Sequence, residues 1–224
     1  MSLYEVEVKS LLGEKENADA LIARMKESDP SVQCLSKNSQ LNHYFEGGDI
    51  HLLFVNTEHL FNDIQKEKLK LITEKGSNFS VRTRQKDTQV LLVVKASVDE
   101  GTSENTVTRM EFEEEVSVLL DELDALVQKS GYQYQAKWSR AREEYSFKGM
   151  NVCLDKNAGY GYLAEFEKMV ADEGTLIDAR AEIDVLMAEL GVEELSQERL
   201  ARMFDFYNKN WAEYYGTEKT FSIE

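Results

Sequence analysis

The stretch YEVEVK, residues 4–9, alternates charged and apolar side chains, and MEFEEE, residues 110–115, repeats that alternation later in the chain. Successive side chains of a strand point to opposite faces, so Glu5, Glu7 and Lys9 are expected to share one face of the first strand. Each stretch is followed by a helical pattern and then by further strand patterns. The repeat predicts an α+β fold of two β-α-β-β-β halves, in which about eight antiparallel strands close into a barrel with helices packed outside.

Apolar periodicity assigns the remaining elements around these two stretches. Strands are predicted at residues 3–10, 32–46, 79–86, 89–97, 108–117, 140–147, 150–156 and 161–169. Helices are predicted at 16–27, 60–76, 116–131 and, as a pair, 175–215, and a polar loop at 98–106. The apolar stripes of these helices, expected to face the core, include Leu60, Ile64, Leu69, Ile72, Leu119, Leu123 and Ile177. The segment 50–76 is interpreted either as a lid or as packing. One domain is expected, with a first half at 1–106, a second half at 107–170 and C-terminal helices at 171–224.

Composition and charge exclude several classes of protein. The formal net charge is -16, which opposes general binding to the nucleic acid backbone, so no nucleic acid partner is expected. The two cysteines, Cys34 and Cys153, do not form a paired motif, which argues against a disulfide framework and against a structural zinc site. No stretch approaches the roughly 20 apolar residues that a membrane span needs, so a cytoplasmic protein without membrane contact is expected.

Charged residues recur at alternate positions in most of the predicted strands. They are Glu5, Glu7 and Lys9; Arg82 and Arg84; Lys95; Arg109, Glu111 and Glu113; Arg140 and Arg142; and Glu165 and Glu167. A sheet with one solvated face gives a similar alternation. Here, however, many pairs at i and i+2 carry the same charge and lie about 6–7 Å apart, so they repel each other unless an opposite charge or a ligand faces them. A barrel with a charged interior would provide that partner.

Acidic and basic clusters together indicate one kind of ligand. Paired carboxylates are hard oxygen ligands suited to Mg²⁺ or Mn²⁺. Arginine binds phosphate oxygens in a bidentate manner, and lysine adds a point charge. The sequence has neither a GxxxxGK[ST] motif nor a GxGxxG motif, so a phosphate loop at a helix N-terminus is not the mechanism. The pattern therefore favours a metal–polyphosphate ligand.

Several motifs, taken in order, resemble those of the CYTH family, the triphosphate tunnel metalloenzymes. They are YEVEVK (4–9), VRTR (81–84), VVK (93–95), TRMEFE (108–113), RAREEY (140–145), CLD (153–155) and GYGYLAEFE (159–167). The family includes class IV adenylyl cyclases, thiamine triphosphatases and inorganic triphosphatases. The resemblance implies a tunnel with an acidic metal side and a basic phosphate side.

The resemblance also implies a role for each charged residue. The metal ligands for Mg²⁺ or Mn²⁺ would be Glu5, Glu7, Asp155, Glu165 and Glu167. The triphosphate would be bound by Lys9, Arg82, Arg84, Lys95, Arg109, Arg140 and Arg142. The catalytic residues would be Glu5, Glu7, Lys9, Glu111 and Glu113. Two of them, Glu111 and Glu113, would take a second metal or orient water together with Asp155.

The resemblance leaves more than one activity open. A triphosphatase acting on tripolyphosphate, ATP or thiamine triphosphate is favoured, because the segment 198–216 is similar to the long C-terminal helix of thiamine triphosphatases. Class IV cyclases carry a His-Phe pair before the first motif, and the sequence has none there. Asn42 also stands where the family often has an aspartate. A cyclase that makes cyclic AMP and diphosphate, a non-catalytic polyphosphate-binding module and a purely structural acidic protein remain alternatives, and a homodimer is left open.

Overall fold

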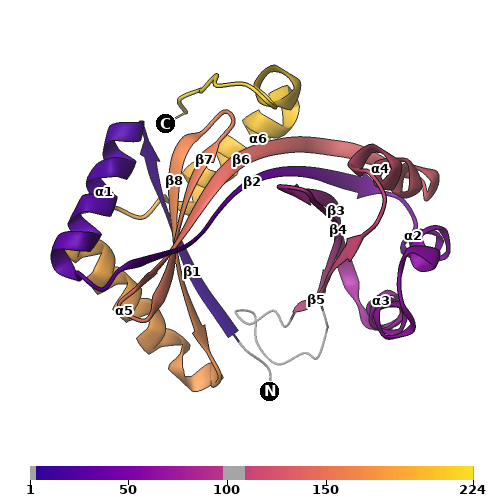
Figure 1. Cartoon of the computed structure of the whole chain (residues 1–224), viewed down its shortest axis with the longest axis horizontal. Helices are drawn as coiled ribbons and strands as arrows, with labels where there is room; N and C mark the ends of the chain where they lie inside the picture. The colour runs from indigo at the N-terminus through magenta and orange to yellow at the C-terminus, as the bar shows by residue number, and fades with distance from the viewer. Residues whose placement is uncertain (1–3, 98–108, 224) are drawn as a thin grey trace. The chain divides into compact units, whose positions relative to one another are not determined.

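The computed structural model describes residues 4–97 and 109–223 (Figure 1). The strands are β1 (Tyr4–Gly13), β2 (Gln33–Gly47), β3 (Ser77–Lys86), β4 (Gln89–Ser97), β5 (Arg109–Val116), β6 (Tyr132–Phe147), β7 (Met150–Asn157) and β8 (Gly161–Val170). The helices are α1 (Lys15–Ser28), α2 (Ile50–Thr57), α3 (Asp63–Lys75), α4 (Leu120–Lys129), α5 (Leu176–Glu189) and α6 (Gln197–Tyr214). Short 3₁₀ turns lie at Glu58–Leu60 and Glu173–Thr175. The predicted polar loop at 98–106 falls outside the described residues.

The eight strands form one antiparallel sheet in the order β1-β8-β7-β6-β2-β3-β4-β5. The predicted α+β class is therefore confirmed, and both predicted halves are present, as β1-α1-β2-β3-β4 and β5-α4-β6-β7-β8 with α2 and α3 added to the first. Strands β1 and β5 stand at the two ends of this order, so no hydrogen bonds among the described residues close the sheet.

The chain forms two compact units. The terminal unit comprises residues 1–39 and 139–224, and the central unit comprises residues 40–138. The two longest strands, β2 and β6, each contribute residues to both units. The predicted division at residues 106 and 170 follows the repeat in the sequence and stays a prediction.

The terminal unit buries one face of β1 and β8 under helices. Val8 and Phe166 point from these strands into a core that includes Leu21 and Met25 of α1 and Ile183 of α5. Figure 1 shows α1 and α5 lying along these strands. The residues on either side of Val8 and Phe166 must then point to the opposite face, which is how the alternation in the sequence positions the charged residues.

In the central unit, α3 and α4 cover the sheet, and segment 50–76 contains two helices rather than one. Asn62 and Gln65 form a capping box, in which each side chain accepts a hydrogen bond from the other residue's backbone N–H, and this cap begins α3. Ile64 lies in the first turn of α3 and is 74% exposed, so the prediction that it faces the core is wrong. Leu69 and Ile72 are buried as predicted.

Three further predictions differ from the structure. Strand β6 begins at Tyr132, not near residue 140, and its early residues Tyr132 and Ala136 are buried between polar neighbours. Leu119 is the N-cap residue of α4 and is 71% exposed. Ile177 in the first turn of α5 is 82% exposed. Both apolar residues lie at a helix start, where the stripe inferred from periodicity extends past the packed turns.

A buried polar network joins strands β2, β3 and β6 to helix α4 within the central unit. The Asp124 carboxylate accepts hydrogen bonds from Thr83 Oγ1 at 2.5 Å and Tyr134 OH at 2.6 Å, and His43 Nδ1 lies 2.6 Å from it. Burial raises the pKa of Asp124, but the hydrogen bonds from His43, Thr83 and Tyr134 outweigh it, so this pKa lies below its ordinary value of 3.8. The carboxylate is therefore charged at neutral pH.

Replacing this shared acceptor should destabilise the central unit. Asp124→Ala is expected to lower the free energy of unfolding by about 3–5 kcal/mol, because the buried His43 and Thr83 and the half-buried Tyr134 lose a charged acceptor. Urea denaturation followed by circular dichroism measures the change. The matched control is Asp121→Ala, an exposed residue in the first turn of the same helix, which should cost under about 1 kcal/mol.

The stability difference between wild type and Asp124→Ala should depend on pH. A carboxylate with a lowered folded-state pKa contributes stability that is fully present above its ordinary pKa, here 3.8, and is lost as the pH falls through the folded value. The stability difference between wild type and Asp124→Ala should therefore shrink below about pH 4. A difference that stays constant from pH 6 to pH 3, checked over that range by urea denaturation, would contradict this account.

Candidate functional site

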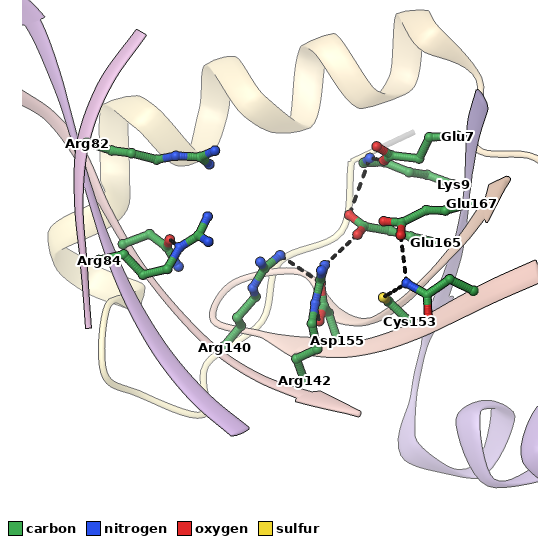
Figure 2. Close-up of polar contacts among 12 residues, drawn as sticks. Glu7, Lys9, Arg82, Arg84, Arg140, Arg142, Cys153, Asp155, Glu165 and Glu167 are labelled. Atoms are coloured by element: carbon green, nitrogen blue, oxygen red, sulfur yellow. Dashed lines mark hydrogen bonds and ion pairs between the residues drawn. The ribbon is translucent and has the colours of Figure 1, made fainter. Parts of the chain in front are cut away.

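The terminal unit brings carboxylates from neighbouring strands onto one sheet face. The antiparallel register places Glu7 of β1 opposite Glu167 of β8, and Lys9 opposite Glu165. On the other side of β8, Cys153 of β7 lies opposite Glu165. Directly paired residues of antiparallel strands point to the same face, so these side chains converge. Figure 2 shows them together.

Lys9 lies among these carboxylates. Its Nζ forms an ion pair with Glu7 and lies 3.3 Å from Glu165 Oε1. Burial raises the pKa of Glu165, but the positive charges of Arg142, Lys9 and Arg140 together lower it by more. The pKa of Glu165 therefore lies below its ordinary value. Glu165, which is only 8% exposed, is therefore an anion held by cations on two sides.

Asp155 on β7 holds two arginines of β6. Its Oδ1 accepts a hydrogen bond from Arg142 Nε at 2.7 Å, and its Oδ2 accepts from Arg142 Nη2 at 2.6 Å and from Arg140 Nη1 at 2.9 Å. Arg142 also donates to Glu165 at 2.5 Å. Burial lowers the pKa of Arg142, but Asp155 and Glu165 more than offset this, so the guanidinium stays charged. Asp155 is fully buried and fixes both arginines in orientation.

Cys153 is a residue of this site that the sequence analysis did not single out. It is fully buried, and burial raises the pKa of its thiol to about 12, although Arg142 opposes the shift. Asn151 Nδ2 donates to Glu167 Oε2 at 2.8 Å and lies 3.4 Å from Cys153 Sγ. The alternation of Asn151, Cys153 and Asp155 along the predicted strand was the signal that could have revealed it.

The central unit carries a second charged face, on β2, β3, β4 and β5. Arg82 Nη1 donates to Tyr44 OH at 2.8 Å, and its guanidinium carbon lies 5.3 Å from the centre of the Tyr44 ring. Arg84 donates to Asn42 Oδ1 at 2.8 Å and to Glu113 Oε1 at 2.6 Å. Asn42, at the position where the resemblance leads one to expect an aspartate, thus accepts from arginine through its amide oxygen.

A pocket of about 360 Å³ opens at one end of this face. Its lining includes Asn78, Ser80, Arg82, Lys95 and Ser97. Lys95 Nζ lies 3.0 Å from Glu111 Oε1. The Nε atom of Arg82 is buried and has no hydrogen-bond partner in the described part of the chain. A buried guanidinium N–H without an acceptor is costly, and an anionic ligand would satisfy it.

The predicted site residues thus fall into two groups. The terminal unit brings together Glu7, Lys9, Arg140, Arg142, Asp155, Glu165 and Glu167. The central unit brings together Arg82, Arg84, Lys95, Glu111 and Glu113. For Glu5 and Arg109 the structure gives only the backbone, which pairs with Met169 and Ser97 respectively, so their side-chain roles stay predictions. Within each unit several of these residues form ion pairs with an opposite charge, and that charged residues face each other across a barrel stays a prediction.

The acidic end of the terminal unit fits a divalent cation. One ligand atom each of Cys153, Glu165 and Glu167 can be chosen so that all lie within 4.8 Å of one another. Carboxylate pairs of this kind suit Mg²⁺ or Mn²⁺, which bind oxygen ligands. Asp155 differs, since both of its oxygens already accept hydrogen bonds from arginine. Its predicted role as a metal ligand stays a prediction.

Within residues 4–97 and 109–223, none of the helices is long and apolar enough to span a membrane.

Comparisons with known proteins agree with this architecture. The family model for the CYTH domain matches residues 69–201. A conserved hypothetical protein of Pyrococcus furiosus is 17% identical, with a TM-score of 0.58 over 87% of this chain and 93% of that one. The PH1819 protein of Pyrococcus horikoshii is 20% identical, with a TM-score of 0.56 over 87% and 94%.

A candidate adenylate cyclase of Vibrio parahaemolyticus is 17% identical, with a TM-score of 0.55 over 90% of this chain and 99% of that one. At these identities the likeness concerns the fold. A search of curated protein sequences found no match. The family model covers more than half of the 224 residues. The chain belongs to the CYTH family.

Proposed function

We propose that this protein is a divalent-metal-dependent triphosphatase that hydrolyses inorganic, nucleoside or thiamine triphosphate. One observation carries the proposal: a single face of the terminal unit presents the carboxylates of Glu165 and Glu167 beside Arg140 and Arg142, which Asp155 holds in place. Carboxylates bind the metal and arginines bind phosphate, so this face has both functions that a metal–triphosphate ligand requires.

The metal ligands in this proposal are Glu7, Glu165 and Glu167, with Glu5 added from its place in β1. A bound Mg²⁺ or Mn²⁺ would supply Lewis-acid polarisation of phosphoryl oxygens. Lys9 pairs with Glu7 and Glu165, and it keeps these carboxylates from repelling each other. The same ammonium group can contact a phosphate oxygen as a point charge.

Phosphate binding is assigned to the basic residues of both faces. They are Lys9, Arg140 and Arg142 in the terminal unit, and Arg82, Arg84, Lys95 and Arg109 in the central unit. In hydrolysis, water attacks the terminal phosphorus, the bond to the bridging oxygen breaks, and charge spreads over the phosphoryl oxygens. Fixed guanidinium groups stabilise that charge without reorganising. Arg140 and Arg142 suit this role because Asp155 orients them before substrate arrives.

Glu111 and Glu113 are assigned to orienting the attacking water or a second cation. Each carboxylate faces a cation of its own unit, Glu111 with Lys95 and Glu113 with Arg84. Glu111 is 43% and Glu113 is 32% exposed at the side chain, so water reaches both.

The closed barrel is also part of this proposal. Strands β1 and β5 are the two ends of the strand order. Closure requires that the outer edge of each of these strands is hydrogen-bonded. Amide hydrogen exchange on the full chain should then show slow exchange at alternate residues of both strands. Rapid exchange along the whole outer edge of either strand would exclude a closed barrel.

The decisive experiment identifies products. The protein is incubated with Mg²⁺ or Mn²⁺ and, separately, tripolyphosphate, ATP or thiamine triphosphate. Release of inorganic phosphate supports the proposal. Cyclic AMP with diphosphate would assign a cyclase instead, and binding without turnover would assign a polyphosphate-binding module.

Glu7→Gln tests the metal assignment. The carboxamide keeps the size of the side chain but loses the charge that a hard cation needs. Metal-dependent kcat/KM should fall by about 100-fold, as for loss of one electrostatic group of a reaction centre. The control, Glu16→Gln, changes an exposed glutamate in the first turn of α1 and should leave the rate unchanged. Wild-type turnover by Glu7→Gln at saturating Mg²⁺ would remove Glu7 from the site.

Arg82→Ala tests the phosphate assignment in the central unit. Loss of a charged hydrogen bond is worth about 1.5–3 kcal/mol, so tripolyphosphate should bind about tenfold to a hundredfold more weakly by calorimetry. The control is Arg202→Ala on α6, whose side chain is 51% exposed. A thermal melt shows whether each variant folds. Unchanged affinity in a folded Arg82→Ala protein would show that this strand does not bind the substrate.

A further inference from the structure

The buried network around Asp124 lies on the opposite face of the two strands that hold Arg82, Arg84 and their partners. We propose that Asp124 is a positioning residue, which acts through His43 and Thr83 to keep these two arginines in place for phosphate. The inference rests on the proposed function in one respect, because the assignment of the arginines to phosphate belongs to that function.

Strand register relates the network to the arginines. Three consecutive pairs of residues join β2 and β3: Asn42 with Arg84, His43 with Thr83, and Tyr44 with Arg82. Adjacent residues of a strand point to opposite faces, so the middle pair points into the core while the outer two pairs lie on the charged face. Each arginine donates a hydrogen bond to its own partner in this list.

Asp124 binds both members of the middle pair. Its Oδ1 accepts a hydrogen bond from Thr83 Oγ1 at 2.5 Å, and its Oδ2 lies 2.6 Å from His43 Nδ1. A charged carboxylate can only accept, so Nδ1 of His43 is the donor. The three residues are each 2% exposed or less. One carboxylate of α4 thus fixes β2 and β3 at the pair that separates the two arginines.

Stability alone does not explain a charged group at this place. The core of the unit is otherwise largely apolar, with Phe45, Val81 and Leu92 buried in it. A buried charge with its partners generally gives no more stability than apolar side chains of similar volume. Hydrogen bonds add direction, because they hold at one distance and angle, whereas apolar burial has no direction. Such support is what binding residues on the other face of a strand require.

The two arginines must be held at a fixed separation to contact one polyanion together. Figure 2 shows Arg82 and Arg84 side by side and pointing the same way. Charged hydrogen bonds weaken steeply as distance and angle depart from the ideal. A misplacement of about 1 Å can cost a reacting group on the order of a hundredfold, so a smaller shift of the two strands should cost about tenfold.

Thr83→Val tests the proposal, because valine keeps the shape of the side chain and loses the hydrogen bond to Asp124. Calorimetry on the full chain should show tripolyphosphate binding about tenfold more weakly. In hydrolysis, KM should rise while kcat changes by less than about threefold, as when contacts made equally to substrate and transition state are weakened. Thr83→Ser keeps the hydroxyl donor, so its affinity should stay within about twofold of wild type.

The matched control is Tyr134→Phe, which removes a different hydrogen bond to the same carboxylate. Tyr134 OH donates to Asp124 at 2.6 Å from β6. His43 and Thr83 stay bound to Asp124 in this variant, so its affinity should stay within about twofold of wild type even where its melting temperature falls. Thermal melts give an assay temperature at which each variant is folded.

A second variant covers the case in which Thr83→Val does not fold. Asp124→Asn keeps the shape of the side chain but offers one amide oxygen in place of two carboxylate oxygens. It should also raise KM more than it lowers kcat, and an unchanged KM in the folded variant would count against the proposal.

Equal losses of affinity in Thr83→Val and Tyr134→Phe would show a general effect of stability and overturn the proposal, as would wild-type affinity in folded Thr83→Val. Either result, together with hydrolysis by wild type, would defeat this inference alone. Weaker binding confined to Thr83→Val and Asp124→Asn, without hydrolysis of any triphosphate, would defeat only the proposed function. Failure of wild type to bind tripolyphosphate would overturn both.

Discussion

Repulsion between like charges at alternate positions of one strand is the constraint that organises both charged faces. Arg140 and Arg142 are two residues apart on β6, and they coexist because the buried carboxylate of Asp155 accepts hydrogen bonds from both. Lys9 likewise forms ion pairs with both Glu7 and Glu165, which would otherwise repel each other. Most of these ion pairs join different strands of the sheet, so the register of the sheet and the balance of charge depend on each other. A shift of one residue between two strands would separate the pairs that join them and expose the apolar face.

The two units balance these like charges with different kinds of residue. In the terminal unit Asp155 and Glu165 are buried, and the fully buried Asp155 fixes the arginines. In the central unit the arginines are fixed by neutral partners as well, through Tyr44 and Asn42, and Glu111 and Glu113 are more exposed than Glu165. Neutral partners leave more of the positive charge available to an external anion. The proposed function uses this difference, with the terminal face assigned to a cation and its phosphate and the central face assigned to phosphate.

Local patterns made much of this structure predictable. Alternation along each strand identified the strands and the charged face, because it depends only on the period of the backbone. The fold class and the order of elements followed from the repeat. The helix predicted at 60–76 is α3, which begins only at Asp63 because Asn62 and Gln65 form its cap, and the short helix α2 before it was not predicted. The start of β6 was missed because QYQ gives a weak apolar signal.

Cross-strand features could not be predicted in the same way. The contact of Cys153 with Asn151, and its place opposite Glu165, depend on which residues pair between β7 and β8. The network around Asp124 likewise needs β2, β3, β6 and α4 to meet. Helical spacing from Leu120 and Val127 places Asp124 on the buried face of α4, but the sequence does not show which partners it meets there. Burial, hydrogen bonding and charge balance are properties of the assembled sheet.

In a strand with one apolar and one charged face, the residues that stabilise the fold are different from the residues that can contact a ligand. Val8 and Phe166 can keep the helices in place while the residues beside them change, because neighbours along a strand share no packing. Such a protein can evolve new ligand preferences without passing through unfolded intermediates. This independence gives a physical reason why chains that share only 17–20% of their residues can keep a common architecture.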